Sequence, residues 1–337
     1  MTNDLTEWFA DAGWGVLCHW LAAAPSSNGG AELGAEEWNR WVDAFDVKGL
    51  ANQLAAVGAP YFFITLGQNS GHFLSPNATY DRLVGIAPSK CSCRDIVAEL
   101  YDQLHPRGIE LLVYLCSGAP SSDPVAVEQL GWEWGFEGGK PNAWGPRRTG
   151  KRLAAFQQKW EAIVREWSER WGHKIRGWWI DGCYFADEMY RHADEPNFRS
   201  FAAALKAGNP DSIVAFNPGV VSNIWDDGSG RYVISHTEHE DYTAGEWDRA
   251  LPECPGSWVE KNGHKARYHV LTYLGEFWCK GQPRFPDELV VGYTKHVASR
   301  GGVITWDAPI ERSGLIPDVY MRQLMAVGEA MRNRCLA

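Results

Sequence analysis

Carboxylates and histidines gather at the ends of short apolar runs in this sequence. Residues 175–182 read Ile-Arg-Gly-Trp-Trp-Ile-Asp-Gly, so the run ends on a single carboxylate, Asp181. A short continuous apolar run is typical of a buried parallel strand, and parallel barrels carry their catalytic groups at the carboxyl ends of strands. Asp is also a favoured helix N-cap. This run alone therefore leaves a catalytic and a capping interpretation of Asp181 open.

Polar side chains follow the other apolar runs as well. They are His19 and Trp20, Gln68, Asn69, Ser70 and His72, Cys116 and Ser117, Asn217, the segment 236–241, Glu246, and Trp306 with Asp307. Helix caps would explain some of the Asp and Asn residues, but not His19-Trp20 or the segment His-Thr-Glu-His-Glu-Asp at 236–241. If the runs are neighbouring strands of one barrel, these side chains converge on one pocket.

Two chemistries fit such a collection. Paired carboxylates suit glycoside hydrolysis, in which one acts as nucleophile and the other as acid/base. The cluster His236, Glu238, His239 and Glu240 could instead bind a metal through imidazole and carboxylate groups. Alternate residues of a strand share a face, but no helical His-x-x-x-His pair supports these ligands. We therefore expect no metal and no cofactor.

Short apolar runs alternate with amphipathic segments along the whole chain. The predicted strands are residues 14–19, 60–66, 109–115, 175–181, 212–216, 232–236, 269–273 and 302–306, and the predicted helices are 46–57, 94–105, 153–171, 197–207, 287–299 and 317–332. This alternation predicts an α/β protein, a (β/α)8 TIM-like barrel forming a single catalytic domain over residues 1–337. A doubly wound sheet would normally open on a glycine-rich phosphate turn, which is absent. A long loop at 117–150 is predicted to be functional or a lid.

The amino-acid composition disfavours some classes of binding partner. The chain has 337 residues, 45% of them hydrophobic and 22% charged, so a large core is expected. The net charge of −10 disfavours a nucleic acid or an anionic membrane as partner, and no apolar run approaches a membrane span. Eighteen Trp residues favour packing in general and, for a few of them, stacking on the apolar face of a sugar.

Cysteine usage and the N-terminus bear on the compartment. The eight Cys residues include no Cys-x-x-Cys pair, which favours free thiols in a reducing compartment. The first residues are acidic and lack the apolar core of a signal peptide. We therefore expect a cytoplasmic protein, and the sequence leaves its oligomeric state open.

Several motifs, in order, resemble one known family. His19-Trp20 closes the first predicted strand, Glu37-Trp38 follows it, residues 177–182 carry Asp181, and residues 241–246 read Asp-Tyr-Thr-Ala-Gly-Glu. The segments 57–66, 253–258, 300–302 and 313–317 continue the similarity. Together they resemble the catalytic domain of the α-L-fucosidases of glycoside hydrolase family 29, as a divergent member.

The resemblance implies a retaining exo-glycoside hydrolase acting on an α-L-fucoside or a related glycoside of an oligosaccharide or glycoconjugate. Asp181 would be the nucleophile and Glu246 the acid/base, with Glu238 and Glu240 as competitors for the second role. The other residues that would bind or stack on the sugar are His19, Glu37, Trp38, Gln68, Asn69, His72, Trp179, Glu238, Glu240 and Trp258. Each Trp among them has an ordinary core interpretation as well.

Two departures from the family matter. The family usually has a His-His pair after its second strand, where this chain has Gln68-Asn69 with His72 nearby. A sugar other than fucose is therefore an alternative, and so is a non-catalytic carbohydrate-binding protein on a degenerate hydrolase barrel. The family also commonly carries a C-terminal β-sandwich, which we do not expect here.

Overall fold

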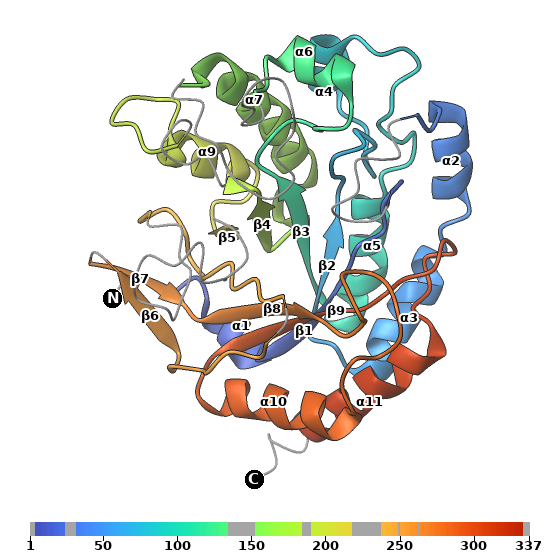
Figure 1. The fold of residues 1–337 in the computed structure, drawn as a ribbon, viewed down its shortest axis with the longest axis vertical. Helices are drawn as coiled ribbons and strands as arrows, with labels where there is room; N and C mark the ends of the chain where they lie inside the picture. Colours follow the sequence, from blue (N-terminus) through green and yellow to red (C-terminus); the bar gives the residue numbers. More distant parts are fainter. Residues whose placement is uncertain are drawn as a thin grey trace.

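A curled parallel sheet of seven strands, flanked by helices, forms the centre of the structure (Figure 1). The computed structural model describes residues 4–23, 32–133, 152–183, 190–217, 237–248, 250–261 and 263–332. The sheet order is β5-β4-β3-β2-β1-β9-β8, and every neighbouring pair is parallel. The strands are β1 (Trp14–Cys18), β2 (Tyr61–Thr65), β3 (Glu110–Cys116), β4 (Gly177–Asp181), β5 (Ile213–Phe216), β8 (His269–Tyr273) and β9 (Val303–Asp307).

Helices connect most of these strands, and most of the helices lie on the outer, convex side of the sheet (Figure 1). They are α1 (Glu7–Ala12), α2 (Ala35–Asp43), α3 (Val47–Val57), α4 (Ala78–Val84), α5 (Ile96–Leu104), α6 (Pro124–Leu130), α7 (Ala154–Trp171), α9 (Phe198–Leu205), α10 (Asp287–Ser299) and α11 (Asp318–Arg332), with 3-10 turns η1 (His105–Arg107) and η2 (Gly172–Lys174). Local chemistry sets their ends. The Asp46 side chain accepts from the Gly49 N–H to begin α3, and Gly58 ends it in a left-handed conformation at φ 71°.

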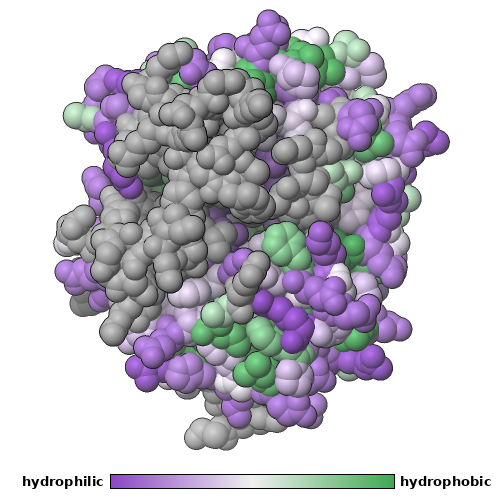
Figure 2. All heavy atoms as spheres, in the orientation of Figure 1, coloured by the Kyte–Doolittle hydropathy of each residue, from purple (hydrophilic) through white to green (hydrophobic). Residues whose placement is uncertain are grey.

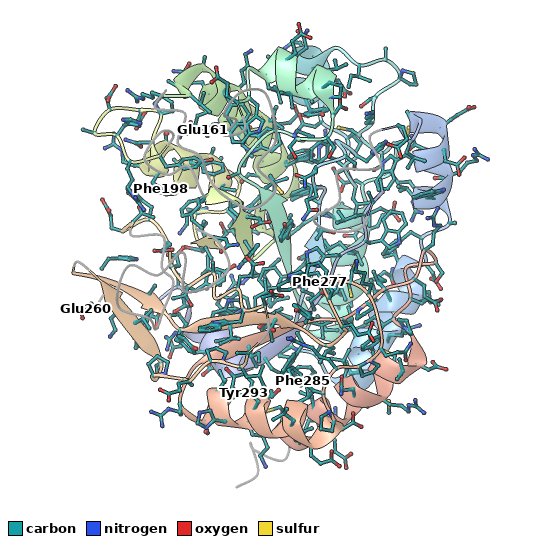
Figure 3. The ribbon with its side chains drawn as sticks, in the orientation of Figure 1. Glu161, Phe198, Glu260, Phe277, Phe285 and Tyr293 are labelled. Carbon is teal, nitrogen blue, oxygen red and sulfur yellow. The ribbon has the colours of Figure 1, made fainter. Side chains whose placement is uncertain are left out.

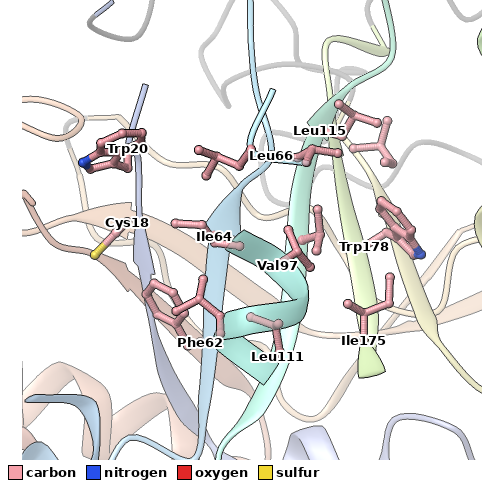
Figure 4. Close-up of a cluster of buried hydrophobic side chains, with 14 of the residues drawn as sticks. Cys18, Trp20, Phe62, Ile64, Leu66, Val97, Leu111, Leu115, Ile175 and Trp178 are labelled. Atoms are coloured by element: carbon pink, nitrogen blue, oxygen red, sulfur yellow. The ribbon is translucent and has the colours of Figure 1, made fainter. Parts of the chain in front are cut away.

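The two faces of the sheet form separate apolar clusters because successive strand side chains point to opposite sides. In β4, Trp178 and Ile180 belong to the outer cluster, which packs against the helices (Figure 4). Trp179 belongs to the inner cluster, within the curl of the sheet. Asp181 lies two residues after Trp179 and therefore shares its inner face. This alternation places the carboxylate inside the curl.

Helix α1 covers the amino ends of the strands. Its Phe9 ring lies 4.9 Å from the ring of Tyr61 and 5.4 Å from that of His269. These two residues are the first of β2 and β8. One end of the curl is therefore closed by α1, and the opposite end, where the strands finish, is left for the site.

An irregular segment at residues 241–247 lies between the edge strands β5 and β8. The Asp241 N–H donates to the Val214 carbonyl at 2.8 Å, and the Trp247 N–H donates to the Leu271 carbonyl at 2.9 Å. Glu246 forms an isolated parallel bridge with Leu271. The segment thus bonds to both edges of the sheet without being a regular strand.

The structure confirms the α/β class and the parallel sheet, and corrects the prediction in detail. All predicted strands except 232–236 are present within two residues of their expected bounds, as are the six predicted helices. The strand predicted at 232–236 lies outside the described residues, and the eight-stranded closed barrel is seen only as a curled seven-stranded sheet. The elements that were not predicted are α1, α2, α4, α6, the 3-10 turns η1 and η2, and the antiparallel hairpin of β6 (Trp258–Lys261) and β7 (His264–Arg267).

Hydrophilic residues dominate the described part of the face in Figure 2, with apolar residues grouped below its centre. Within the described ranges, no helix combines the length and the apolar character needed to cross a membrane. The predicted loop at 117–150 contains α6, and its residues 134–150 lie outside the described part of the chain.

Candidate active site

Asp181 stands at the carboxyl end of β4 and accepts hydrogen bonds on both of its carboxylate oxygens. Its Oδ1 accepts from the Gly182 N–H at 2.7 Å and from Asn217 Nδ2 at 2.9 Å. Its Oδ2 accepts from the Tyr114 hydroxyl. Gly182 has a φ of 76°, a left-handed conformation that glycine adopts readily at this turn. Donors on both oxygens hold the carboxylate in one orientation.

Asn217 joins Asp181 to a second carboxyl group. It follows β5 directly and is fully buried. The same Nδ2 atom that donates to Asp181 also donates to Glu246 Oε2, at 2.6 Å. Since one nitrogen contacts both oxygens, the distance between these oxygens cannot exceed the sum of the two hydrogen-bond lengths. The structure therefore brings the two predicted catalytic carboxyls, Asp181 and Glu246, to either side of one amide.

The environment of Glu246 favours its protonated form. Burial, followed by the negative charge of Asp181, raises the pKa of Glu246 to about 8, against a partial lowering by the Asn217 hydrogen bond. Asp248 adds a further, smaller upward contribution to this pKa. At neutral pH Glu246 therefore holds a proton beside Asp181, and the pair can supply one acid and one carboxylate.

Backbone contacts of the 241–247 segment place Glu246. Gly245 has a φ of 62°, and a Cβ built on it would lie 1.9 Å from the His269 carbonyl oxygen. The Leu271 N–H donates to the Gly245 carbonyl at 2.7 Å. The other end of the segment is held by Asp241, whose Oδ2 accepts from Lys206 Nζ and the Val214 N–H, both at 2.8 Å.

His19, predicted to bind the sugar, lies beside this pair. Its Nδ1 is 2.8 Å from Asp307 Oδ1. Its ring meets the Tyr114 ring edge to face at 5.2 Å and the Trp278 ring at 5.8 Å. Because Tyr114 donates to Asp181, His19 is one residue removed from that carboxylate.

Gln68 and Trp179 also reach Asp181 through Tyr114. Gln68 Nε2 donates to the Tyr114 hydroxyl at 2.8 Å. Trp179 stacks on the Tyr114 ring at 5.2 Å, and its Nε1 donates to the Ala244 carbonyl at 2.9 Å. Trp179 is 2% exposed, so it supports the site from the interior and offers little open face for a sugar.

Four other predicted binding residues lie around α2 or the turn after β2. Trp38 is buried against Trp20 at 5.3 Å and against His72 at 5.2 Å. Both ring nitrogens of His72 have protein partners, Ser70 Oγ at 3.2 Å and the Leu33 carbonyl at 2.9 Å. Burial lowers the pKa of His72 to about 4.

The remaining two members of this group contact their own neighbours. The Glu37 carboxylate accepts from Trp41 Nε1 at 2.8 Å and pairs with Arg40. The Asn69 carbonyl accepts from the Ser122 N–H at 2.9 Å. Among the residues that the structure describes, no hydrogen bond, ion pair or ring contact joins Glu37, Trp38, Asn69 or His72 directly to Asp181 or Glu246.

The two competitors for the acid role are placed differently from Glu246. The Glu238 side chain is 77% exposed and lies 3.6 Å from His239. Glu240 is buried, and its backbone carbonyl accepts from His264 Nε2 at 2.9 Å. His236 lies outside the described residues. Across the described ranges, no group of three or more His, Cys, Asp or Glu residues is arranged to hold a metal ion.

Trp258 lies at the amino end of the sheet, opposite Asp181. It pairs in register with Arg267, just before the start of β8, and the Arg267 guanidinium lies 3.8 Å above its ring. Glu260, on the same hairpin, lies at the far left of Figure 3, well separated from Phe277, which follows β8. The structure therefore does not bring Trp258 to the carboxylate pair.

Sequence reasoning missed Tyr114, Trp278 and Tyr273 as site residues and left Asn217 without a role. Tyr114 sits in an apolar strand and reads as core, although the alternation of β3 puts it on the inner face, two residues before Cys116. The Tyr273 hydroxyl donates to Asp248 Oδ1 at 2.6 Å. Counting back two residues from Cys116, at the end of β3, is the signal that would have found Tyr114.

No family model matches the chain, and no curated protein matches it either. Solved structures do. An endo-fucoidan hydrolase of glycoside hydrolase family 107 is 16% identical with a TM-score of 0.67, covering 96% of this chain and 93% of its own. A family 29 α-L-fucosidase from Bacteroides thetaiotaomicron, trapped as a covalent intermediate, is 18% identical with a TM-score of 0.64, covering 98% and 75%.

A third solved structure, the α-L-fucosidase AlfC in complex with 4-nitrophenyl-α-L-fucopyranoside, is 14% identical with a TM-score of 0.66 and covers 99% of this chain and 100% of its own. At these identities the likeness establishes the fold alone. The chain is similar in fold, over almost its whole length, to fucosidases and fucoidan hydrolases.

Proposed function

We propose that this protein is a retaining glycoside hydrolase with Asp181 as nucleophile and Glu246 as acid/base. One observation carries the proposal: the Asn217 amide nitrogen lies 2.9 Å from an Asp181 oxygen and 2.6 Å from a Glu246 oxygen. That contact keeps the nearest oxygens closer than the roughly 6.5 Å at which inverting carboxyl pairs begin. A retaining pair sits about 5–5.5 Å apart, which this geometry allows.

The pKa of Glu246 supports its double role. In the free enzyme the protonated Glu246 would donate to the leaving oxygen while Asp181 attacks the anomeric carbon. Once Asp181 is esterified its negative charge is gone, and the electrostatic contribution that raises the pKa of Glu246 goes with it. The pKa of Glu246 would then fall, which favours the carboxylate form that can take a proton from the attacking water.

We propose an α-L-fucoside, or a related glycoside, released from the end of an oligosaccharide or glycoconjugate. Support comes from the motifs around His19, Asp181 and Glu246 together with a fold shared with fucosidases. Gln68 contacts Tyr114, so it supports the nucleophile side of the pocket. The sugar hydroxyls that a His-His pair would hold need other partners in this chain.

The direct test is turnover of 4-nitrophenyl α-L-fucoside and a panel of other aryl glycosides, with proton NMR of the first anomer released. We expect hydrolysis with retention, and loss of at least about a thousandfold in kcat for Asp181→Asn, since no nucleophile remains. Release of the inverted anomer would overturn the mechanism. Sugar binding without turnover of any glycoside, fucoidan oligosaccharides included, would favour a non-catalytic carbohydrate-binding protein.

A further inference from the structure

Asp307 holds two different donors at the end of β9. Its carboxylate is fully buried. Oδ1 lies 2.8 Å from His19 Nδ1, and Oδ2 accepts the Cys279 backbone N–H at 2.8 Å. A buried carboxylate with a bond on each oxygen is a fixed group, so it can define the state of the residue it touches.

The hydrogen-bond roles in this chain of groups follow from the donors available. An ionised carboxylate only accepts, so His19 Nδ1 must carry the proton that joins it to Asp307. In the neutral imidazole the other nitrogen, Nε2, is then an acceptor. No bond to Nε2 is recorded from any residue that the structure describes. The ring lies against Tyr114, the donor to Asp181, so the imidazole borders the pocket beside the proposed nucleophile.

We propose that Asp307 is a positioning residue that keeps His19 in the Nδ1-protonated tautomer, so that Nε2 accepts a hydrogen bond from one hydroxyl of the sugar bound at Asp181. This inference rests on the proposed glycosidase function and adds the direction of one contact to it. Asp307 and His19 together would then favour a substrate with a hydrogen-bond donor facing Nε2 over a substrate that has only an acceptor there.

Cys279 strengthens the case that Asp307 organises this side of the pocket. Cys279 has a φ of 54°, unusual for a residue with a side chain, and this conformation accompanies the bond from its N–H to Asp307. The preceding residue, Trp278, packs 5.8 Å from His19 and 4.8 Å from Tyr273. The same carboxylate thus fixes the imidazole and anchors the segment that carries the adjacent indole.

The informative substitution is Asp307→Asn, which keeps the size of the side chain. Its single amide oxygen can accept from Cys279 or from His19, but not from both. With the oxygen held by the Cys279 N–H, the new NH2 group donates to Nδ1 and drives the proton to Nε2. Nε2 then donates where it formerly accepted. We expect kcat/KM on 4-nitrophenyl α-L-fucoside to fall about tenfold to a hundredfold, the effect of one mispaired polar contact.

Monodeoxy aryl fucosides identify the hydroxyl concerned. On the analogue that lacks the hydroxyl bound by Nε2, the wild-type protein and Asp307→Asn should have the same kcat/KM within about twofold, while every other analogue keeps the full difference. An equal loss on all analogues would show a merely structural role and overturn the proposal.

A readout independent of activity is the ¹⁵N chemical shift of the His19 ring, assigned by its loss in His19→Gln. We expect a protonated Nδ1 in the wild type and a protonated Nε2 in Asp307→Asn. A protonated Nε2 in the wild type would contradict the inference even if the protein hydrolyses fucosides. If no glycoside is hydrolysed, the proposed function fails, yet the tautomer is still tested.

The matched control is Asp95→Asn. Asp95 also accepts a backbone N–H, from Ala98, and a ring N–H, from Trp171, but it does so at the start of α5, outside the site. We expect Asp95→Asn to leave the deoxy-analogue pattern and the His19 signals unchanged.

Discussion

Three neighbouring residues, together with burial, set the pKa of Glu246. Burial and the charges of Asp181 and Asp248 raise its pKa, and the amide of Asn217 lowers it. The Asp248 carboxylate in turn accepts a hydrogen bond from the Tyr273 hydroxyl at 2.6 Å. Substitution of Asp248 therefore tests how its charge affects the pKa of Glu246.

The pH profile should follow this arrangement. With Glu246 as the proposed acid, its protonated form is the active one in the free enzyme, so kcat/KM should fall as the pH rises through about 8, the pKa of Glu246. Asp248→Asn removes a negative charge, lowers that pKa and should move the basic limb to lower pH by about half a unit or less, as expected for a screened neighbour. The measurement is kcat/KM between mildly acid and alkaline pH, with the exposed Asp211→Asn as control. A basic limb that moves to higher pH in Asp248→Asn would contradict the assignment of Glu246 as the acid.

At the scale of elements, the 241–247 segment does what a strand would do in a regular barrel. It bonds to β5 through Asp241 and to β8 through Gly245 and Trp247. Its backbone approaches β8 so closely at Gly245 that a side chain would meet the His269 carbonyl at 1.9 Å. The position of Glu246 therefore depends on its glycine neighbour.

Gly245→Ala tests this dependence. A Cβ there clashes with backbone and disfavours the φ of 62°, so we expect a loss of about 2–4 kcal/mol in the free energy of unfolding and a drop in kcat as Glu246 moves. The control is Gly292→Ala within α10, where a Cβ would meet nothing within 4 Å. That change should stabilise the protein by about 0.5–1 kcal/mol. Urea unfolding gives the stability of both variants, and initial rates give their kcat. If Gly245→Ala changes neither quantity, the close packing at Gly245 is refuted.

Apolar runs predicted the strands well because buried parallel strands need little besides continuous apolar surface. The hairpin of β6 and β7 escaped prediction because its residues Glu260 and Lys265 are polar and give no apolar run. The Arg267 and Lys265 cations lie over the Trp258 ring, a contact that the local pattern does not reveal. The 241–247 segment likewise has no strand pattern. Its contacts are made by backbone and by Asp241, which local sequence does not reveal.

The candidate site shows a similar division. Asp181 and Glu246 could be proposed from the sequence because each ends or nearly ends a motif, 177–182 or 241–246, that resembles a known family. The partners of His72 could not, since one of them is the Leu33 carbonyl, a backbone atom distant in sequence. The contact of Gln68 with Tyr114 depends on two strands lying side by side with matching alternation, which only the fold determines.

At the scale of the whole molecule, two buried histidines link folding to pH. His269 lies inside the curl, bonded to the Thr243 carbonyl at 3.0 Å and to Thr305 Oγ1 at 2.8 Å. Burial lowers the pKa of His269 to about 4, as it does for His72. An unfolded chain would take up these protons near the ordinary pKa of 6.5, so the unfolded state gains protons first as the pH falls.

The sign of the effect follows directly. Stability should be complete above about pH 6.5 and should decline as the pH falls toward 4, by on the order of 3 kcal/mol for each histidine. His269→Gln should flatten the decline, although its stability at neutral pH also drops through lost packing. Urea unfolding at a series of pH values measures the slope, with the exposed His105→Gln as control. An unchanged slope in His269→Gln would show that this ring is not the source.

Because the backbone around Glu246 is irregular, the position of Glu246 does not depend on the strand register that fixes Asp181. Asp181 is fixed by the register of β4 with its neighbours, whereas Glu246 is fixed by a few contacts to β5 and β8. Insertions or deletions near Asp241 would therefore change the gap between the two carboxyls while leaving the sheet in register. In the proposed reaction, this distance decides between retention and inversion. Redesign of residues 241–247 alone could therefore change the stereochemical outcome without altering the sheet.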